Sequence, residues 1–242
     1  MRAKPEPVLQ NWPRCIHLAG VDGSGKTTQA RAILSCIEQQ GIPARCVWLR
    51  FPWLFCVPFL IYARLRGYSR RETVEGHSHG YWDFGASWLM SNVFPWVLLL
   101  DTFLLALAKI YVPYWRGYTV ICDRFVADIL VDLMAGLDDN GFDERLPGRL
   151  FWALLPHGAR VVVFDLDTEA AQRRCPELAG DRTHSKRRAI YLDIARRRHL
   201  PVFTTTDSVD GVFFQLGDKI AVKVDRLATK LNPISDAPLD RS

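Results

Sequence analysis

The sequence predicts an α/β fold, in which a doubly wound, five-stranded parallel sheet carries helices on both faces. Three observations predict it. Short, nearly continuous apolar runs recur along the 242 residues, as in strands that are buried on both faces. Helical patterns separate these runs, as in successive strand–helix units. A glycine-rich segment joins the first run to the first helical pattern, which is typical of a loop that holds phosphate groups at a helix N-terminus.

The expected strands are the five apolar runs, taken in chain order. They are Cys15–Ala19, Ala44–Leu49, Thr119–Cys122, Val161–Phe164 and Val202–Thr204. The first helix is the clearest, because Ala30, Ile33 and Ile37 recur at helical spacing and Gly41 supplies a stop.

One domain is expected over residues 15–230, because a chain of this length can bury one sizeable core. Residues 1–14 lack the apolar core of a secretory signal, and we expect them and residues 231–242 to be flexible tails. An apolar fraction of 49% and a charged fraction of 24% exclude a disordered or fibrous chain. The six cysteines form no CxxC pair, so we expect reduced thiols and a cytoplasmic protein.

The segment from Gly20 to Thr27, GVDGSGKT, matches the phosphate-binding pattern GxxxxGK[ST] in full. Its glycines let backbone N–H groups approach phosphate oxygens, because no Cβ stands in the way. We expect Lys26 to reach the β- and γ-phosphates and the Thr27 hydroxyl to bind Mg²⁺. The sequence therefore predicts that ATP and Mg²⁺ bind here. The expected ATP-binding residues are Gly20, Gly23, Ser24, Gly25, Lys26, Thr27 and Thr28.

Four motifs, in this order and spacing, resemble the thymidylate kinase family. They are GVDGSGKTTQ from Gly20, LRFP at Leu49–Pro52, VICDRF at Val120–Phe125 and VFDLDTEAAQRR at Val163–Arg174. The resemblance covers about residues 15–228. It implies a P-loop nucleotide kinase fold and transfer of the γ-phosphoryl group of ATP to thymidylate, a step of nucleotide biosynthesis. It also implies a homodimer with a small-molecule acceptor, and we expect no nucleic-acid partner.

The resemblance implies roles for single residues. Asp123 would orient Mg²⁺ through water, and Arg124 would bridge the donor and acceptor phosphates. A lid at about residues 173–188 would close over ATP and supply an arginine, because Gly23 stands where some relatives carry a cation. The leading lid candidates are Arg174 and Arg182, with Lys186 and Arg187 behind them. The expected catalytic residues are Lys26, Asp123, Arg124, Arg174 and Arg182, and the expected metal ligands are Thr27 and Asp123.

The acceptor side departs from the family. Phe103 stands where relatives carry the arginine that grips the monophosphate, and Leu99 replaces the aromatic residue that stacks on thymine. The chain instead carries acids at Asp101 and Asp128, which are either acceptor-side groups or exposed helix acids. A hydroxyl acceptor needs a carboxylate for its proton, whereas a phosphate acceptor does not. The expected acceptor-binding residues are Asp22, Arg50, Phe51, Leu99, Phe103 and Asp128.

Three functions follow from these residues. The first is a kinase that phosphorylates thymidylate or a related nucleoside monophosphate. The second is the same fold acting on a hydroxyl of a nucleoside, a sugar or a lipid-linked alcohol. The third is a regulator that binds ATP without transfer. The intact Lys26, Thr27, Asp123 and Arg124 favour an enzyme.

Residues 51–115 are expected to form apolar helices on the acceptor side. Within them, residues 84–108 could span a bilayer by length, but Pro95 and Asp101 favour a buried helix pair in a soluble domain. The apolar face could also contact a dimer partner or a membrane surface, where lipid head groups would meet basic residues. Those residues are Arg64, Arg66, Arg70 and Arg71. The segment HSHG at His77–Gly80 is expected to be a loop rather than a metal site.

Overall fold

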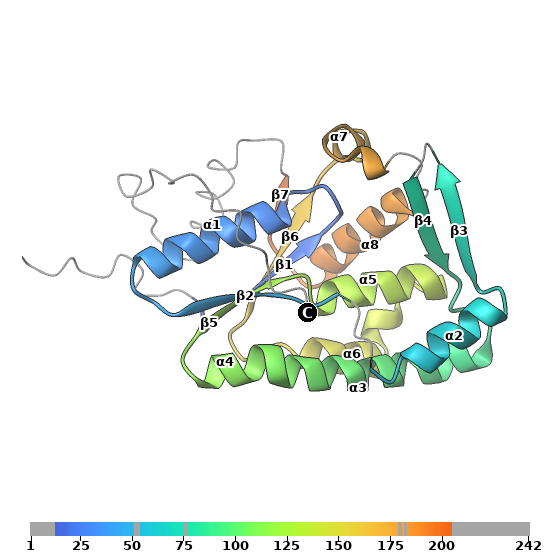
Figure 1. Ribbon diagram of the computed structural model, residues 1–242, viewed down its shortest axis with the longest axis horizontal. Coiled ribbons are helices and arrows are strands. Elements are labelled where there is room, and N and C mark those ends of the chain that lie inside the picture. Colours follow the sequence, from blue (N-terminus) through green and yellow to red (C-terminus); the bar gives the residue numbers. More distant parts are fainter. Residues whose placement is uncertain (1–12, 51–53, 75–76, 179–180, 182, 205–242) are drawn as a thin grey trace, which may run out of the picture.

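The computed structural model describes residues 13–50, 54–74, 77–178, 181 and 183–204 (Figure 1). A five-stranded sheet has the strand order β2-β5-β1-β6-β7, and each neighbouring pair is parallel. The strands are β1 (Cys15–Gly20), β2 (Ala44–Trp48), β5 (Thr119–Asp123), β6 (Arg160–Asp165) and β7 (Val202–Thr204). The predicted fold class is confirmed.

The strands β1 and β5 are buried along their whole length, as their continuous apolar runs predict. Side chains of β1 alternate between two cores, with Ile16 and Leu18 on the face of α1 (Lys26–Gln39) and Cys15 and Ala19 on the opposite face. β5 runs one residue further than predicted, so that Asp123 is its last residue and pairs in register with Leu18. The carboxyl ends of β1 and β5 therefore lie together at one edge of the sheet.

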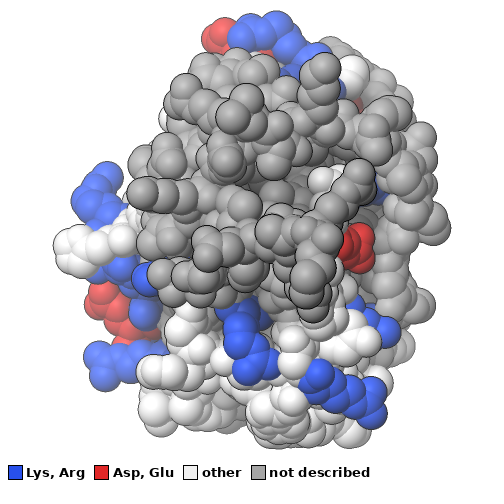
Figure 2. Space-filling view, turned by 90° about the vertical axis from the view of Figure 1, so that its left-hand side faces the viewer, with Lys and Arg blue, Asp and Glu red and all other residues white. Residues whose placement is uncertain are grey.

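Helices cover both faces of the sheet (Figure 1). The buried face of α1 includes Ala30, Ile33 and Ile37, as the spacing predicts. On the other side lie α2 (Val57–Leu65), α5 (Val126–Leu137), α6 (Leu146–Ala153) and α8 (His184–Arg197). On the face shown in Figure 2, the visible Lys and Arg side chains lie in several separate places.

The predicted buried helix pair is one continuous helix, from Leu89 to Trp115. Two π-helical segments, Leu89–Val93 and Leu107–Tyr111, alternate with α3 (Phe94–Ala106) and α4 (Val112–Trp115). Pro95 lies inside this helix, at the junction between the first π-helical segment and α3, and does not end it. By length and composition this helix could cross a membrane, although 39% of its most apolar window is buried inside the protein.

A two-stranded antiparallel hairpin, β3 (Ser69–Val74) and β4 (His77–Trp82), was not predicted. The segment HSHG is therefore part of a strand, and the expectation of a loop is wrong. Just after β4, the backbone N–H groups of Phe84 and Gly85 donate to the carbonyl oxygen of Gly136 in α5, at 2.7 and 3.2 Å. A Cβ at Gly136 would lie 2.5 Å from the Phe84 ring, so glycine permits this close approach. Among the described residues, no cluster of His, Cys, Asp or Glu could hold a metal ion.

Short elements complete the chain. A 3₁₀ helix at Phe142–Glu144 precedes α6, and α7 (Thr168–Arg174) begins at the Asp167 carboxylate, which accepts from the Glu169 N–H at 3.1 Å. A 3₁₀ helix at Pro176–Leu178 follows α7. The described part of the predicted lid thus comprises the end of α7, this 3₁₀ helix and the first turn of α8. Apart from residues 13 and 14, the predicted tails lie outside the described residues.

Candidate active site

The predicted phosphate loop connects β1 to the N-terminus of α1. Gly20 has φ +136°, and a Cβ there would lie 2.1 Å from the carbonyl oxygen of Phe164 in β6. Any side chain at Gly20 would push β1 and β6 apart. Gly25 precedes α1 with φ +81° and leaves the free N–H groups of the first helical turn accessible to an anion.

Lys26 folds back onto this loop. Its ammonium donates to the Val21 carbonyl and, at 3.3 Å, to Ser24 Oγ. The residue is 4% exposed. Burial, together with the positive charge of Arg124, lowers the pKa of the Lys26 ammonium to about 7.

This lowered pKa predicts that ATP binding takes up a proton. Phosphate oxygens favour the charged ammonium and raise its pKa, so the affinity for ATP should fall as the pH rises above about 7, by at most about tenfold per pH unit. Calorimetry at about pH 8 in buffers of different ionisation enthalpy measures the uptake. Lys26→Arg, which stays charged, should abolish it. An unchanged proton uptake in that variant would contradict the assignment to Lys26.

The expected metal ligands are in direct contact. Thr27 Oγ1 donates to Asp123 Oδ2 at 2.6 Å. Asp123 is fully buried, and its Oδ1 has no hydrogen-bond partner among the described residues. A buried carboxylate oxygen that lacks a donor, beside a hydroxyl, is the kind of oxygen pair that Mg²⁺ prefers. These residues therefore fit Mg²⁺.

Arg124 follows Asp123 with φ +75°, a left-handed conformation that is uncommon for a residue with a side chain. Its guanidinium contacts the Asp22 carboxylate and lies 3.5 Å from Asp128 Oδ1. Burial alone would raise the pKa of the Asp22 carboxyl, but the charges of Arg124 and Arg50 hold this pKa well below its usual range. Asp22 therefore stays ionised and positions both guanidiniums at the loop.

Asp128 is 1% exposed, so the interpretation as an exposed helix acid is wrong. Its Oδ1 accepts from the Tyr191 hydroxyl at 2.7 Å, and its Oδ2 accepts from the Phe125 N–H at 3.2 Å. His17 Nε2 lies 3.7 Å from Oδ2. The carboxylate thus holds Arg124 from the protein interior and does not line the pocket.

Asp101 is fully buried and is not an exposed helix acid either. Its carboxylate accepts from three successive backbone N–H groups that precede α2, those of Leu54, Phe55 and Cys56, at 3.1, 2.9 and 2.9 Å. Because both oxygens are engaged, Asp101 fixes this segment against α3 and does not serve an acceptor hydroxyl.

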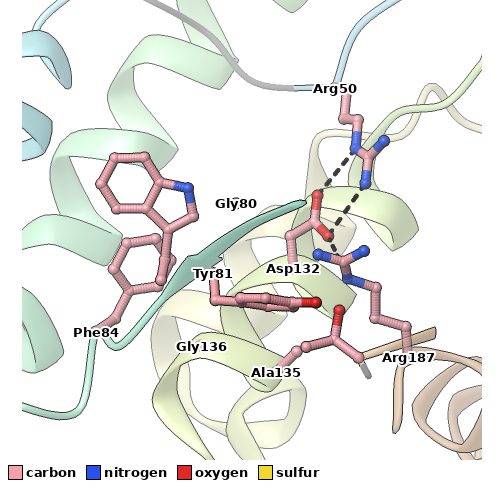
Figure 3. A pocket seen from close by; sticks show the side chains of 10 residues that line it. Arg50, Gly80, Tyr81, Phe84, Asp132, Ala135, Gly136 and Arg187 are labelled. Atoms are coloured by element: carbon pink, nitrogen blue, oxygen red, sulfur yellow. Dashed lines mark hydrogen bonds and ion pairs between the residues drawn. The ribbon is translucent and has the colours of Figure 1, made fainter. Parts of the chain in front are cut away.

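Arg50 connects the phosphate loop to a pocket of about 230 Å³ (Figure 3). Its Nη1 lies 3.4 Å from Asp22 Oδ2, and its Nε donates to Asp132 Oδ2 at 3.1 Å. Arg187 Nε lies 3.4 Å from Asp132 Oδ1 on the other side. The pocket lies between β4, α5 and α8, and it is lined by Arg50, Gly80, Tyr81, Trp82, Phe84, Asp132, Ala135, Gly136, Thr183 and Arg187.

Of the predicted acceptor residues that the structure describes, Arg50 lines this pocket, whereas Asp22, Asp128, Leu99 and Phe103 do not. Phe103 is 44% exposed, and Leu99 packs against the core. The phase of α3 is the reason, because Leu98, Asp101 and Thr102 occupy its buried face and turn Phe103 outward. Phe51 lies outside the described residues. The lining residues of β4 were missed, because nothing in the sequence of this hairpin indicates that it reaches α5.

The lid candidates are placed differently from one another. Arg174 is exposed at the end of α7, and Arg182 lies outside the described residues. Lys186 donates to Asp138 Oδ1 at 2.6 Å, and Arg187 Nη1 lies 3.5 Å from Asp181. The last two side chains are therefore engaged on the acceptor side rather than at the phosphate loop.

Residues of α7 and α8 lie close to the phosphate loop. A Cβ at Gly23 would lie 3.4 Å from the Ala171 carbonyl oxygen in α7. His184, the first residue of α8, has Nε2 3.3 Å from the Asp22 carbonyl oxygen and Nδ1 3.3 Å from Thr168 Oγ1. The starts of α7 and α8 are thereby tied to the phosphate loop.

Comparison with known proteins relates the chain to thymidylate kinases. No family model matches the chain. The thymidylate kinase of Symbiobacterium thermophilum is 30% identical over 208 residues, which are 81% of this chain and 87% of that protein. The crystal structure of thymidylate kinase from Ehrlichia chaffeensis matches with a TM-score of 0.51 and 19% identity, over 87% of this chain and 100% of that chain. The structural match supports the fold alone.

Proposed function

This chain belongs to the thymidylate kinase family and is a phosphotransferase, and from that premise we propose that it transfers the γ-phosphoryl group of ATP to thymidylate or a related nucleoside monophosphate. The observation that carries the proposal is the pair of Thr27 and Asp123 at the ends of neighbouring elements, beside the ammonium of Lys26. Amide groups, a lysine and a metal-binding oxygen pair converge on one point, as phosphoryl transfer requires.

In this proposal, the phosphate loop, the metal-binding pair and the arginines have separate roles. The backbone of the loop and Lys26 bind the phosphates, which requires Lys26 to exchange the Val21 carbonyl for phosphate oxygens. When bound at Thr27 and Asp123, Mg²⁺ supplies charge neutralisation for those oxygens. Arg124 contacts the transferred group from the acceptor side, and Arg174 or Arg182 contacts it from the lid. Closure of the lid excludes water and thus favours transfer over hydrolysis.

The acceptor would occupy the crevice that begins at Asp22 and continues past Arg50 into the pocket. Asp22 and Arg50 lie near the phosphate loop, so they would orient the reacting end of the acceptor. Asp132 lies on the far side of Arg50 and would contact the remote end. Positioning of the two reactants within this crevice is the main source of catalysis that the chain itself provides.

A hydroxyl acceptor is the second candidate. It is favoured by the carboxylate partners of the three described guanidiniums in the crevice, since Arg124 pairs with Asp22 and both Arg50 and Arg187 pair with Asp132. A monophosphate would have to compete with these carboxylates, and Phe103 leaves it without the family's arginine. A neutral hydroxyl would not have to compete with these carboxylates for the guanidiniums.

Release of ADP by the purified protein tests the proposal. We expect Mg²⁺-dependent turnover with dTMP that exceeds the turnover with dCMP, dAMP and a panel of nucleosides, sugars and lipid-linked alcohols. Faster turnover of an alcohol than of any monophosphate would establish the second candidate. If none of these compounds gives acceptor-dependent ADP release, both candidates are contradicted and the ATP-binding regulator is favoured.

We also propose a homodimer in the cytoplasm. The cytoplasmic location is proposed because the six cysteines form no CxxC pair. The homodimer is proposed because described apolar side chains of α2, α3 and α6 are exposed. They are Ile61, Leu65, Trp96, Leu100, Phe103, Leu104, Leu146 and Leu150. An apolar surface of this kind is usually covered by a partner. Light scattering would support this proposal with the mass of a dimer. A monomer that floats with anionic vesicles would instead support association with a membrane surface.

A further inference from the structure

Two polar groups that line the pocket are buried and have no hydrogen-bond partner among the described residues. They are the hydroxyl of Tyr81 and the Nε–H of Arg187. Buried polar groups in folded proteins are almost always hydrogen-bonded, because desolvation without a partner is costly. Two such groups in the lining of one pocket indicate that a ligand, rather than the protein, completes their hydrogen bonds.

The backbone that follows Tyr81 is anchored to the rest of the protein. Its neighbour Trp82 packs on the Phe84 ring, with centroids 5.9 Å apart. The N–H groups of Phe84 and Gly85 anchor the end of β4 to the Gly136 carbonyl of α5. Figure 3 shows the Tyr81 hydroxyl pointing toward the side of the pocket where Asp132 and Arg187 lie. The hydroxyl is therefore oriented before any ligand binds, which reduces the entropy cost of binding.

The charge of Arg187 is already balanced. Its Nε lies 3.4 Å from Asp132 and its Nη1 lies 3.5 Å from Asp181, but Nε makes no hydrogen bond. The unmet requirement is thus a directional hydrogen bond and not a counter-ion. A Tyr hydroxyl can donate as well, so both groups can serve an oxygen that carries lone pairs. A neutral oxygen satisfies this pair without adding a third anion beside Asp132 and Asp181.

We propose that Tyr81 and Arg187 donate hydrogen bonds to neutral oxygen atoms at the remote end of the acceptor, and that Tyr81 determines acceptor specificity. The inference rests on the proposed function. Arg50 separates these residues from Asp22 and the phosphate loop, so they recognise a part of the acceptor that does not react. The oxygen is either a ring carbonyl or a sugar hydroxyl, which share this chemistry. β4 thereby contributes a recognition residue to a pocket in which Leu99 and Phe103 have no part.

Tyr81→Phe removes the hydroxyl and keeps the ring. We expect the acceptor KM to rise about three- to tenfold, with kcat and the KM for ATP unchanged, because the contact is made equally in the ground state and the transition state. The matched control is Tyr111→Phe, which removes a hydroxyl that donates to the Leu154 carbonyl at 3.1 Å and leaves the pocket intact. An acceptor KM within twofold of the wild-type value in Tyr81→Phe would overturn the proposal.

Substrate analogues distinguish the two sources of the oxygen. With dTMP as acceptor, replacement of a ring carbonyl oxygen by sulfur, or removal of the 3′-hydroxyl, should weaken binding to the wild type. The analogue that lacks the contacted oxygen should bind equally well to wild type and Tyr81→Phe. If each analogue binds more weakly than dTMP by the same factor in the wild type and in Tyr81→Phe, Tyr81 contacts neither oxygen and the proposal is wrong.

Arg187→Lys provides a second test that does not depend on Tyr81. It keeps the positive charge between Asp132 and Asp181 but removes Nε–H. We expect the acceptor KM to rise while the KM for ATP stays constant, and an unchanged acceptor KM would remove Arg187 from the proposal. Failure of the proposed function would be distinct, because the wild type itself would then show no turnover with any monophosphate.

Discussion

Lys26→Ala is expected to lower the rate of acceptor-dependent ADP formation by about 10³-fold, because the charge that develops on the phosphate oxygens loses its cation. The fold should persist. The Val21 carbonyl also accepts from Ser24 Oγ at 2.7 Å, so loss of the ammonium leaves no buried carbonyl without a donor. Steady-state rates at saturating ATP, with circular dichroism of the same samples, measure both quantities.

Lys26→Met separates charge from volume, because it keeps an unbranched side chain in the buried site. It should be as inactive as Lys26→Ala. The control Lys109→Met makes the same change in the second π-helical segment of the long helix, away from the loop. Near-normal activity of either Lys26 variant would mean that the phosphate loop does not hold the transferred group.

Asp101→Ala is expected to lower the free energy of unfolding by about 3 kcal/mol, since three backbone N–H groups before α2 lose their charged acceptor. For a chain of this size, the melting temperature should fall by about 6–12 °C. Leu54 and Phe55 are 50% and 54% exposed, so water can partly replace the carboxylate and limits the loss. Asp101→Asn keeps one acceptor oxygen, so its melting temperature should lie between those of the wild type and Asp101→Ala. Thermal unfolding measures both variants.

The control for this change is Glu38→Ala, which removes an exposed carboxylate from the last turn of α1. Its melting temperature should stay within about 2 °C of the wild type. If Asp101→Ala has the same melting temperature as Glu38→Ala but loses turnover, Asp101 takes part in catalysis and the structural role assigned to it is wrong.

The strands of the sheet could be predicted from the sequence, because each one is marked by a local residue pattern. Strands buried on both faces read as apolar runs, and a glycine motif between β1 and α1 has few other uses. Val202–Thr204 was predicted to the residue, and β5 and β6 each ended one residue later than predicted. These two extra residues are Asp123 and Asp165, whose charge conceals the end of the strand in a hydrophobicity pattern.

The acceptor side could not be predicted, because burial there depends on partners that are distant in sequence. Asp101 and Asp128 look like surface acids until the segment before α2 supplies donors to the first and Tyr191 of α8 supplies one to the second. Phe103 could be placed by motif spacing, but the phase of α3 decides where it points. Tyr81 was missed for a further reason, since a hairpin with mixed polar residues gives no signal that it covers a pocket.

The left-handed backbone of Arg124 carries a conformational cost. Such a conformation costs a residue with a Cβ about 1–2 kcal/mol relative to the right-handed region, whereas glycine adopts it freely. Glycine would relieve this strain, but it would also remove the guanidinium that contacts Asp22 and lies beside the buried Asp128 carboxylate. Relief of strain and loss of these ion pairs oppose each other at this one peptide unit, so an attempt to harden the enzyme should leave Arg124 untouched.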